Sequence, residues 1–270
     1  MAALFFIKSL FLTFTKKNRM RKVYVLIAAF LLAIVSHSLG QKNDLEKLNL
    51  KGKIKFISEL TYQPLQEGDM IIKGRMVQWY TNSFDQSGNK IEDIKYKSDS
   101  TIDKKYIYKY NSEGKRQELT MISGDDLLTL LIKYQYDSQG NLAEDISYDE
   151  KGQMDKKIMY LYGDNGLVME ENIYASSGEL RQKLRYAYNS EKLLVETSRY
   201  RGNGKLERRI TYKHDNLGNE TEEKTFSADG SLISTNSNVY EFDHQGNWIR
   251  KTTLSSNLPV SITEREIIYY

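Results

Sequence analysis

The chain has 270 residues, 28% of them charged, and a formal net charge of +3. All charges in the first 40 residues are positive; without those six bases the chain holds 33 basic and 36 acidic residues, a net charge of −3. The basic character therefore belongs to the N-terminal segment. The rest of the chain has no excess of positive charge, which excludes binding of nucleic acid through a basic surface. Because there is no cysteine, disulfides, thiol catalysis, thiolate metal sites and a lipidated N-terminal cysteine are also excluded.

Residues 1–40 are typical of a signal peptide. A basic segment, 16–22, precedes the apolar core Val23–Val35, and Ser38-Leu39-Gly40 offers small residues for cleavage before Gln41. The apolar core spans 13 residues, fewer than the roughly 20 that a membrane-spanning helix needs. We therefore predict export to the periplasm, cell surface or extracellular space, with an uncleaved membrane anchor as the alternative. Met20 is an alternative start, because the segment that follows it is already a complete signal.

The mature chain is predicted to consist of one short cap and one repeat domain. Residues 41–50 form the cap, with a short helix over 43–48, and residues 51–270 form the domain. In its degenerate first unit we expect strands over 52–62 and 70–80, with Pro64 in the loop between them. Residues 255–259 break the pattern before a last strand that ends at Tyr270.

A repeat of 26 residues dominates the domain. It contains the pattern Tyr-x-Tyr-Asp-x-x-Gly-Asn, and internal periodicity of this kind is typical of repeat architectures. The first tyrosine of the pattern is Tyr108, Tyr134, Tyr160, Tyr186 and Tyr212. Ten positions further on stands a glutamate in six successive units: Glu92, Glu118, Glu144, Glu170, Glu196 and Glu222. Fourteen positions further on stand Tyr96, Ile122, Tyr148, Tyr174, Tyr200 and Phe226.

Each unit contains two turns. In the first, Asp137 can bond the turn backbone and Gly140 can adopt a positive φ, and the sequence 149–152 repeats this chemistry half a unit later. The segments between the turns, such as 141–148 and 153–162, are rich in Tyr, Ile and Leu and have the length of strands. We therefore predict an all-β protein: tandem β-hairpins in one long, twisted antiparallel meander of about sixteen strands, open or coiled.

The even period predicts which side chains share a face. If both turns preserve the alternation of side chains, every residue of a row returns to the same side of the sheet. In one unit this places Glu144, Tyr148 and Tyr160 on a single aromatic face. It also pairs Tyr148 with Met154 and Tyr160 with Glu170 across neighbouring strands.

The segment 134–142, Tyr-Gln-Tyr-Asp-Ser-Gln-Gly-Asn-Leu, and its relatives at Tyr108, Tyr212 and Tyr240 resemble the YD-repeat (RHS-like) family of bacterial secreted and surface proteins. The resemblance covers residues 80–254 and implies coiled β-hairpin sheets, which in some members are linked to carbohydrate binding. The large toxins of that family have many more repeats and a core segment that this chain lacks, so a toxin-enclosing shell is not implied. A weaker likeness connects the chain to MORN-type β-hairpin ribbons, whose glycine-rich spacing is absent.

The residue pattern does not favour catalysis. The segment after residue 40 has two histidines: His214 stands where other units have Tyr or Phe, and His244 lies in a turn. No acid cluster accompanies them, so we predict neither a metal site nor a catalytic triad. The glutamate row suggests the paired acids of a glycosidase, but a residue that recurs in six units is better explained as a partner of tyrosine hydroxyls or cross-strand bases. We expect a non-enzymatic protein without cofactors; calcium at turn aspartates such as Asp137 is the weaker alternative.

The tyrosines supply the candidate binding face. Flat aromatic rings with a hydroxyl suit contacts with glycans or proteins, and packing within the sheet is the alternative role. Binding predicts exposed rings on a concave face, whereas a simple spacer predicts two solvated faces without a pocket. The candidate residues are Tyr108, Tyr134, Tyr160, Tyr186 and Tyr212, here called the first tyrosine row, and Tyr148, Tyr174 and Tyr200, the second tyrosine row.

The predicted function is a secreted, non-catalytic interaction module that contacts carbohydrate or another envelope protein through the aromatic face or a sheet edge. Two alternatives stay open: a structural spacer or surface element without a ligand, and an accessory or immunity protein of a toxin system. We expect no nucleic-acid partner, and contact with the membrane only through the export signal.

Overall fold

The computed structural model describes residues 43–68 and 70–270, so the predicted signal peptide lies outside the described residues. This part of the chain forms one short helix and sixteen strands that follow one another in antiparallel order. The helix is α2 (Asp44–Lys47), and the strands are β1 (Ile54–Glu67), β2 (Met70–Phe84), β3 (Lys90–Tyr96), β4 (Ile102–Tyr110), β5 (Arg116–Ser123), β6 (Leu128–Tyr136), β7 (Leu142–Tyr148), β8 (Met154–Tyr162), β9 (Val168–Ala175), β10 (Leu180–Tyr188), β11 (Leu194–Arg201), β12 (Leu206–His214), β13 (Glu220–Ser227), β14 (Leu232–Phe242), β15 (Trp248–Ser255) and β16 (Leu258–Tyr269).

The turns at one end of the strands follow a common chemical plan. After β6, Asp137 Oδ1 accepts hydrogen bonds from the backbone N–H groups of Gln139 (2.9 Å) and Asn141 (2.8 Å). Gly140 completes this turn at φ +86°, a backbone conformation that costs glycine little. In the turn after β10, Lys192 takes the same place at φ 64°. A lysine in this conformation is less favourable than the glycine that the other units have at the same turn position.

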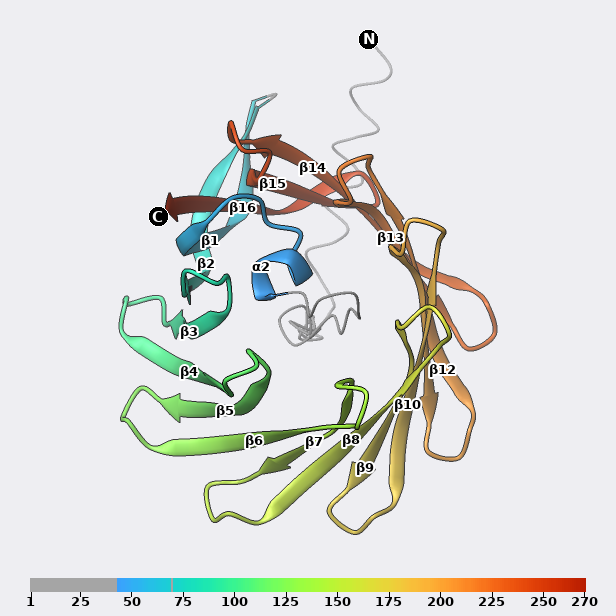
Figure 1. Cartoon of the computed structure of the whole chain (residues 1–270). Helices are drawn as coiled ribbons and strands as arrows, with labels where there is room; N and C mark the ends of the chain where they lie inside the picture. Colours follow the sequence, from blue (N-terminus) through green and yellow to red (C-terminus); the bar gives the residue numbers. More distant parts are fainter. Residues whose placement is uncertain (1–42, 69) are drawn as a thin grey trace. The chain divides into compact units, whose positions relative to one another are not determined.

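The sheet closes into a barrel, because its first and last strands pair (Figure 1). β1 pairs with β16 in antiparallel register, from Ile54 opposite Tyr269 to Tyr62 opposite Ile262. In a meander with an even number of strands the two end strands run antiparallel, so pairing them removes both exposed edges. The prediction of an all-β protein is confirmed, but the prediction of an open or coiled meander is wrong.

Every strand pair contains a register shift. One extra residue, such as Asp155 on β8 or Met169 on β9, stands between consecutive cross-strand pairs. At an extra residue of this kind, a β-bulge, the alternation of side chains between the two faces is offset by one position. Tyr160 consequently pairs with Glu171 and not with the predicted Glu170.

The bulges change which side chains share a face within a unit, but they leave each row on one face from unit to unit. Each unit has two of them, so a row with the 26-residue period still keeps to one face. Within a unit, however, two residues separated by an even number of positions lie on opposite faces if a bulge stands between them. The predicted pair Tyr148 and Met154 is observed, but the pair lies on the face opposite to Tyr160. The prediction of a single aromatic face with both tyrosine rows is therefore wrong.

The position of α2 identifies the inner face. The helix lies within the ring of strands (Figure 1), and Asp44 is only 5% exposed. Asp44 accepts hydrogen bonds from Tyr110 Oη on β4 (2.6 Å) and from Arg116 Nη2 on β5 (3.0 Å). Side chains on the same face of the sheet as Tyr110 therefore point into the barrel, and Tyr108, two residues earlier on β4, is one of them.

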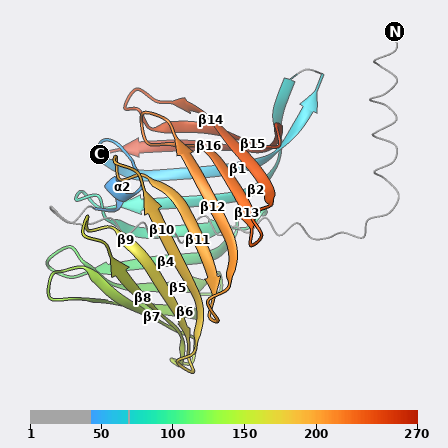
Figure 2. The same cartoon turned by 90° about the vertical axis from the view of Figure 1, so that its right-hand side faces the viewer.

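Pro64 lies inside β1, not in the predicted loop. The pairing of β1 with β16 ends at Tyr62, and the register with β2 shifts between Tyr62 and Pro64. The missing N–H of the proline is therefore accommodated where the ladder is already interrupted. Beyond this point β1 and β2 continue as a hairpin that projects past the neighbouring turns (Figure 2).

Closure of the barrel can be tested with a disulfide across the β1–β16 seam. Thr61 and Thr263 are cross-strand partners whose Oγ1 atoms lie 3.1 Å apart, although 202 positions separate them in the chain. Replacing both with cysteine should give an intramolecular disulfide under mild oxidation, because the two side chains already meet. The product should migrate faster on a non-reducing gel and yield one linked pair of tryptic peptides. The pair Thr61→Cys and Thr225→Cys is the control; an open ribbon would give only links between molecules in both proteins.

Candidate functional site

The first tyrosine row lies on the inner wall, where the hydroxyls of Tyr108 and Tyr160 bond to acids of the wall itself. Tyr108 Oη donates to Asp93 Oδ2 (2.6 Å), and Tyr160 Oη donates to Asp145 Oδ2 (2.5 Å). Tyr160 and Tyr186 belong to one hydrophobic cluster and are 9% and 6% exposed. These contacts favour packing as the role of the first row.

The acceptors of these tyrosines form a row that the sequence analysis missed. They stand one position after the glutamate row, on the opposite face of the strand. In four of the six units this position is an acid, a signal that was present in the sequence. The row consists of Asp93, Leu119, Asp145, Glu171, Thr197 and Glu223.

A further set of inner tyrosines ties β6, β8, β10 and β14 each to the preceding strand. Tyr162 Oη on β8 donates to the carbonyl of Leu142 on β7 (2.9 Å), and Tyr188 on β10 donates in the same way to Val168 on β9 (2.9 Å). To reach the next strand, these side chains must lie along the wall. Together with the first row, they make the inner wall a continuous structural layer.

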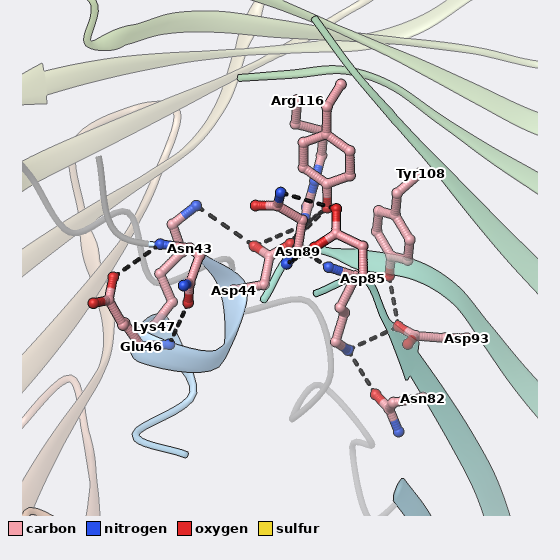
Figure 3. Close-up of polar contacts among 12 residues, drawn as sticks. Asn43, Asp44, Glu46, Lys47, Asn82, Asp85, Asn89, Asp93, Tyr108 and Arg116 are labelled. Carbon is pink, nitrogen blue, oxygen red and sulfur yellow. Dashed lines mark hydrogen bonds and ion pairs between the residues drawn. The ribbon is translucent and has the colours of Figure 1, made fainter. Parts of the chain in front are cut away.

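A buried ionic cluster fastens α2 to this wall (Figure 3). Arg116 bonds Asp44, and Lys90 Nζ on β3 bonds Asn82 Oδ1 (2.7 Å) and Asp93 Oδ2 (2.8 Å). Burial acts to raise the pKa of Asp44, but the charges of Arg116 and Lys47, with hydrogen bonds to the carboxylate, lower it to about 2. The cluster therefore anchors a charged helix to the inner wall.

The segment that contains α2 is also bound to three turns at the same end of the barrel. Asn43 Nδ2 donates to the carbonyl of Ser87 (2.8 Å), and Asn49 Nδ2 donates to the carbonyl of Leu217 (2.9 Å). The backbone N–H of Lys51 donates to Asn247 Oδ1 (2.7 Å). Residues 43–51 thus link turns from both sides of the β1–β16 seam.

The outer wall carries the glutamate row as a ladder of ion pairs. Glu170 is bonded by Lys183 and Arg185, each at 2.9 Å. Burial acts to raise the pKa of Glu170, but hydrogen bonds from Lys183, Arg185 and Asn172 lower it to about 2. The predicted pairing with cross-strand bases is therefore observed, whereas the tyrosine hydroxyls bond the inner acids. The other pairs are Glu92–Lys105 (3.6 Å), Glu118–Lys109 (3.1 Å), Glu144–Lys157 (3.6 Å), Glu196–Arg209 (3.2 Å), and Glu222 with Lys213 (3.0 Å) and Lys224 (3.1 Å).

The second tyrosine row lies on this outer wall, half-buried beside the ion pairs. Lys133 Nζ lies 5.8 Å from the ring centroid of Tyr148, and Lys157 Nζ lies 5.8 Å from that of Tyr174. The Arg185 guanidinium lies 5.5 Å from the ring centroid of Tyr200. Each of these rings therefore has a cation beside it.

Two open grooves lie beside members of the second row. The groove at Tyr200 has a volume of about 400 Å³, and the groove at Tyr174 has a volume of about 530 Å³. The Tyr200 groove is lined by Leu180, Lys183, Arg185, Tyr200, Arg201, Gly202, Asn203 and Gly204. The Tyr174 groove is lined by Glu144, Ile146, Met154, Lys157, Met159, Tyr174, Ala175, Ser176, Ser177 and Gly178. The pocket-forming tyrosines are thus on the outer wall, and not on the concave one that a binding role was expected to use.

Neither His214 nor His244 stands in a metal-binding arrangement. Burial lowers the pKa of His214, which is half-buried, and the ring of His244 lies 6.2 Å from that of Tyr269. Over residues 43–68 and 70–270, His, Asp and Glu side chains form no group of three that could hold a metal ion. Within the same residues, no helix has the length and hydropathy of a membrane span.

The closed antiparallel barrel is a fold seen in porin-like proteins. A porin-like protein from Bacteroides uniformis ATCC 8492 superposes with a TM-score of 0.56 at 9% identity, over 81% of this chain and 98% of the other. A porin-like protein from Bacteroides vulgatus ATCC 8482 gives 0.45 at 14% identity, over 81% and 99%. The Tc holotoxin pore of Photorhabdus luminescens gives 0.31 at 11% identity, over 81% of this chain and 14% of the other. Only the first of these scores supports an inference, and it concerns the fold alone.

The chain belongs to a family whose description is "Uncharacterised protein". The model of this family matches residues 58–217, more than half of the 270 residues. No curated protein matches the chain. The prediction of a YD-repeat (RHS-like) protein, with its weaker MORN-type likeness, is therefore wrong: the matching family is another one, and the sheet is a closed barrel.

The inner acids make stability depend on pH. Burial raises the pKa of Glu171 to about 7, outweighing the opposing effect of the Tyr186 hydroxyl; burial, with the charge of Glu223, raises the pKa of Glu220 to about 7. The folded protein then retains protons that the unfolded chain releases above pH ~4.5. Each group should therefore stabilise the fold by roughly 3 kcal/mol at low pH, and this contribution should be lost as the pH rises through 7.

Urea unfolding at pH 5 and pH 8 measures this dependence. The free energy of unfolding should fall between the two values, and the double variant Glu171→Gln and Glu220→Gln should remove most of the fall. Glu170→Gln, on the outer wall, is the matched control and should leave the fall unchanged, because its pKa lies far below this window. If the free energy of unfolding fell as much in the double variant as in the wild type, the two carboxyls would not be buried in the folded protein.

Proposed function

We propose that the protein is an exported, non-catalytic recognition barrel that binds saccharide chains along its outer wall. The observation that carries this proposal is the pair of grooves beside Tyr174 and Tyr200, which occupy the same place in successive units. Each offers a tyrosine ring, a basic side chain and the polar backbone of a turn. Rings flanked by hydrogen-bonding groups suit the alternating apolar and hydroxyl-bearing faces of sugars.

The spacing of the grooves favours a polymer as the ligand. Equivalent positions in neighbouring units lie two strands apart, roughly 9–10 Å. This is comparable to the length of a disaccharide, so one chain could occupy both grooves with the same contacts. Binding at two linked sites also strengthens the attachment without new kinds of contact.

The outer wall does not favour a lipid-facing surface. Its mid-strand positions hold the ion-pair ladder, including Lys157, Lys183 and Arg185. A lysine or arginine on the lipid face of a barrel costs about 2–4 kcal/mol at the middle of the bilayer. We therefore place the barrel in the aqueous part of the envelope or outside the cell, which agrees with the leader sequence. The inner wall bonds to itself, which supports a structural role for the first tyrosine row.

Saccharide binding is tested with a glycan array probed with the mature chain, residues 41–270. A bound oligosaccharide is then titrated by calorimetry against the wild type, Tyr174→Ala and Tyr200→Ala. Each variant should bind about tenfold more weakly, the loss of about 1.4 kcal/mol that is typical of an aromatic contact at the centre of an interface.

Tyr96→Ala is the matched control. Tyr96 holds the same position in its unit, but Trp79 is stacked on one face of its ring at 4.0 Å, and neither of the two grooves includes it. This variant should bind like the wild type. An array without any bound glycan, or equal binding by Tyr174→Ala, Tyr200→Ala and the wild type, would refute the proposal and leave the spacer as the better account.

A further inference from the structure

The two grooves are copies of one design. Leu180, Lys183, Tyr200 and Gly204 of the Tyr200 groove stand 26 positions after Met154, Lys157, Tyr174 and Gly178 of the Tyr174 groove. In both, an apolar residue opens the strand, a lysine and a tyrosine line the groove, and a glycine completes the turn. Differences between the two grooves therefore report on differences between their ligands.

The two grooves differ in charge at two equivalent positions. Met159 and Ala175 of the Tyr174 groove are replaced by Arg185 and Arg201 in the Tyr200 groove. The Tyr174 groove thus has a lysine paired with Glu144 and an apolar wall, whereas the Tyr200 groove has a lysine and two guanidinium groups.

The surrounding charges do not neutralise this difference. The segment 180–209 holds nine basic and three acidic residues, whereas 154–183, one unit earlier, holds four and five. Glu170 is shared between Lys183 and Arg185. Arg201 is 65% exposed, and the Glu207 that it approaches at 3.7 Å also lies 3.2 Å from Arg199. Positive charge is therefore in excess at the Tyr200 groove.

The turn that carries Arg201 is held firmly against the neighbouring strand. The N–H of Gly202 donates to the carbonyl of Arg181 on β10 (2.8 Å), and a Cβ at Gly202 would lie 1.7 Å from the carbonyl oxygen of Leu180. Only glycine permits this close approach. The arginine is thus presented from a fixed backbone position beside Tyr200.

We infer that the Tyr200 groove is a site for an acidic sugar unit, one that carries a carboxylate on its ring. Guanidinium groups bind carboxylates through paired, charge-assisted hydrogen bonds. The tyrosine ring and the side chain of Asn203 complete the contacts that a sugar ring needs, and about 400 Å³ lies within the usual range of small-ligand sites. This inference rests on the proposed function and names the charge of the sugar unit that the Tyr200 groove binds.

The test uses a tetramer of galacturonic acid and its fully methyl-esterified form, which keeps the sugar rings and removes the charges. The mature wild-type chain should bind the acid at least tenfold more tightly than the ester, and this preference should shrink as salt is added. Arg185→Met and Arg201→Ala install the residues of the neighbouring groove, so they are compatible with the fold. Each should reduce acid binding at least fivefold and leave ester binding unchanged.

Arg209→Met is the matched control. It removes one charge from the same outer wall, from a side chain that pairs with Glu196 and lies over Phe226. It should leave the preference for the acid within twofold of the wild type. Equal binding of acid and ester, or an unchanged preference in both groove variants, would overturn the acidic-sugar inference while the proposed function stands. If neither tetramer nor any arrayed glycan is bound, both fall. A sulfated tetramer bound as tightly as the carboxylated one would overturn the choice of carboxylate.

Discussion

The β-bulge that accompanies each turn of the regular repeat is the constraint on which the rest of the structure depends. Each bulge adds one residue to one strand of a pair and offsets the alternation of side chains. Glu170 and Glu171 point to opposite faces because side chains alternate along β9, and the bulge at Met169 sets which of them points outward. Glu170 forms an ion pair on the outer wall, and Glu171 is buried on the inner wall. Bulges also increase the twist of the strands, which helps to bring β1 and β16 together.

The separation of faces explains how the barrel is stabilised without disulfides. Inside, tyrosine hydroxyls bond to acids and to carbonyls of neighbouring strands, and the Asp44 cluster ties the N-terminal segment to the wall. Outside, the glutamate row pairs with bases. Exposed ion pairs stabilise a protein little, so the inner layer supplies most of the cohesion and the outer wall is left available for recognition.

The sequence predicted the elements better than their assembly. Aspartate and glycine at fixed positions locate the turns, and the strands Leu142–Tyr148 and Met154–Tyr162 begin one residue after the predicted ranges and end with them. Closure could not be predicted, because it depends on pairing between Ile54–Tyr62 and Ile262–Tyr269, segments outside the regular repeat. The faces could not be predicted either, because a bulge leaves no residue signature as clear as a turn glycine. The acid that recurs after the glutamate row was the one available sign of a second, inward-facing row.

For the candidate site, the sequence predicted both tyrosine rows on one face, whereas the structure has the second tyrosine row on the outer wall and the first on the inner wall. The distinction between its grooves depends on Arg185 and Arg201, which only the structure brings together. The excess of basic residues in that unit can be read from the sequence, but the position of Arg185 and Arg201 beside Tyr200 cannot.

The most direct test of the account compares two neighbouring glutamates of identical chemistry. Glu170→Cys and Glu171→Cys are treated, in the folded state, with a maleimide attached to a large poly(ethylene glycol) chain. Labelling should be rapid at position 170 and should occur at position 171 only after unfolding, because the two residues alternate along β9 and the bulge at Met169 sets Glu170 outward and Glu171 inward. Equal labelling of both positions, or faster labelling at 171, would contradict the assignment of inner and outer walls.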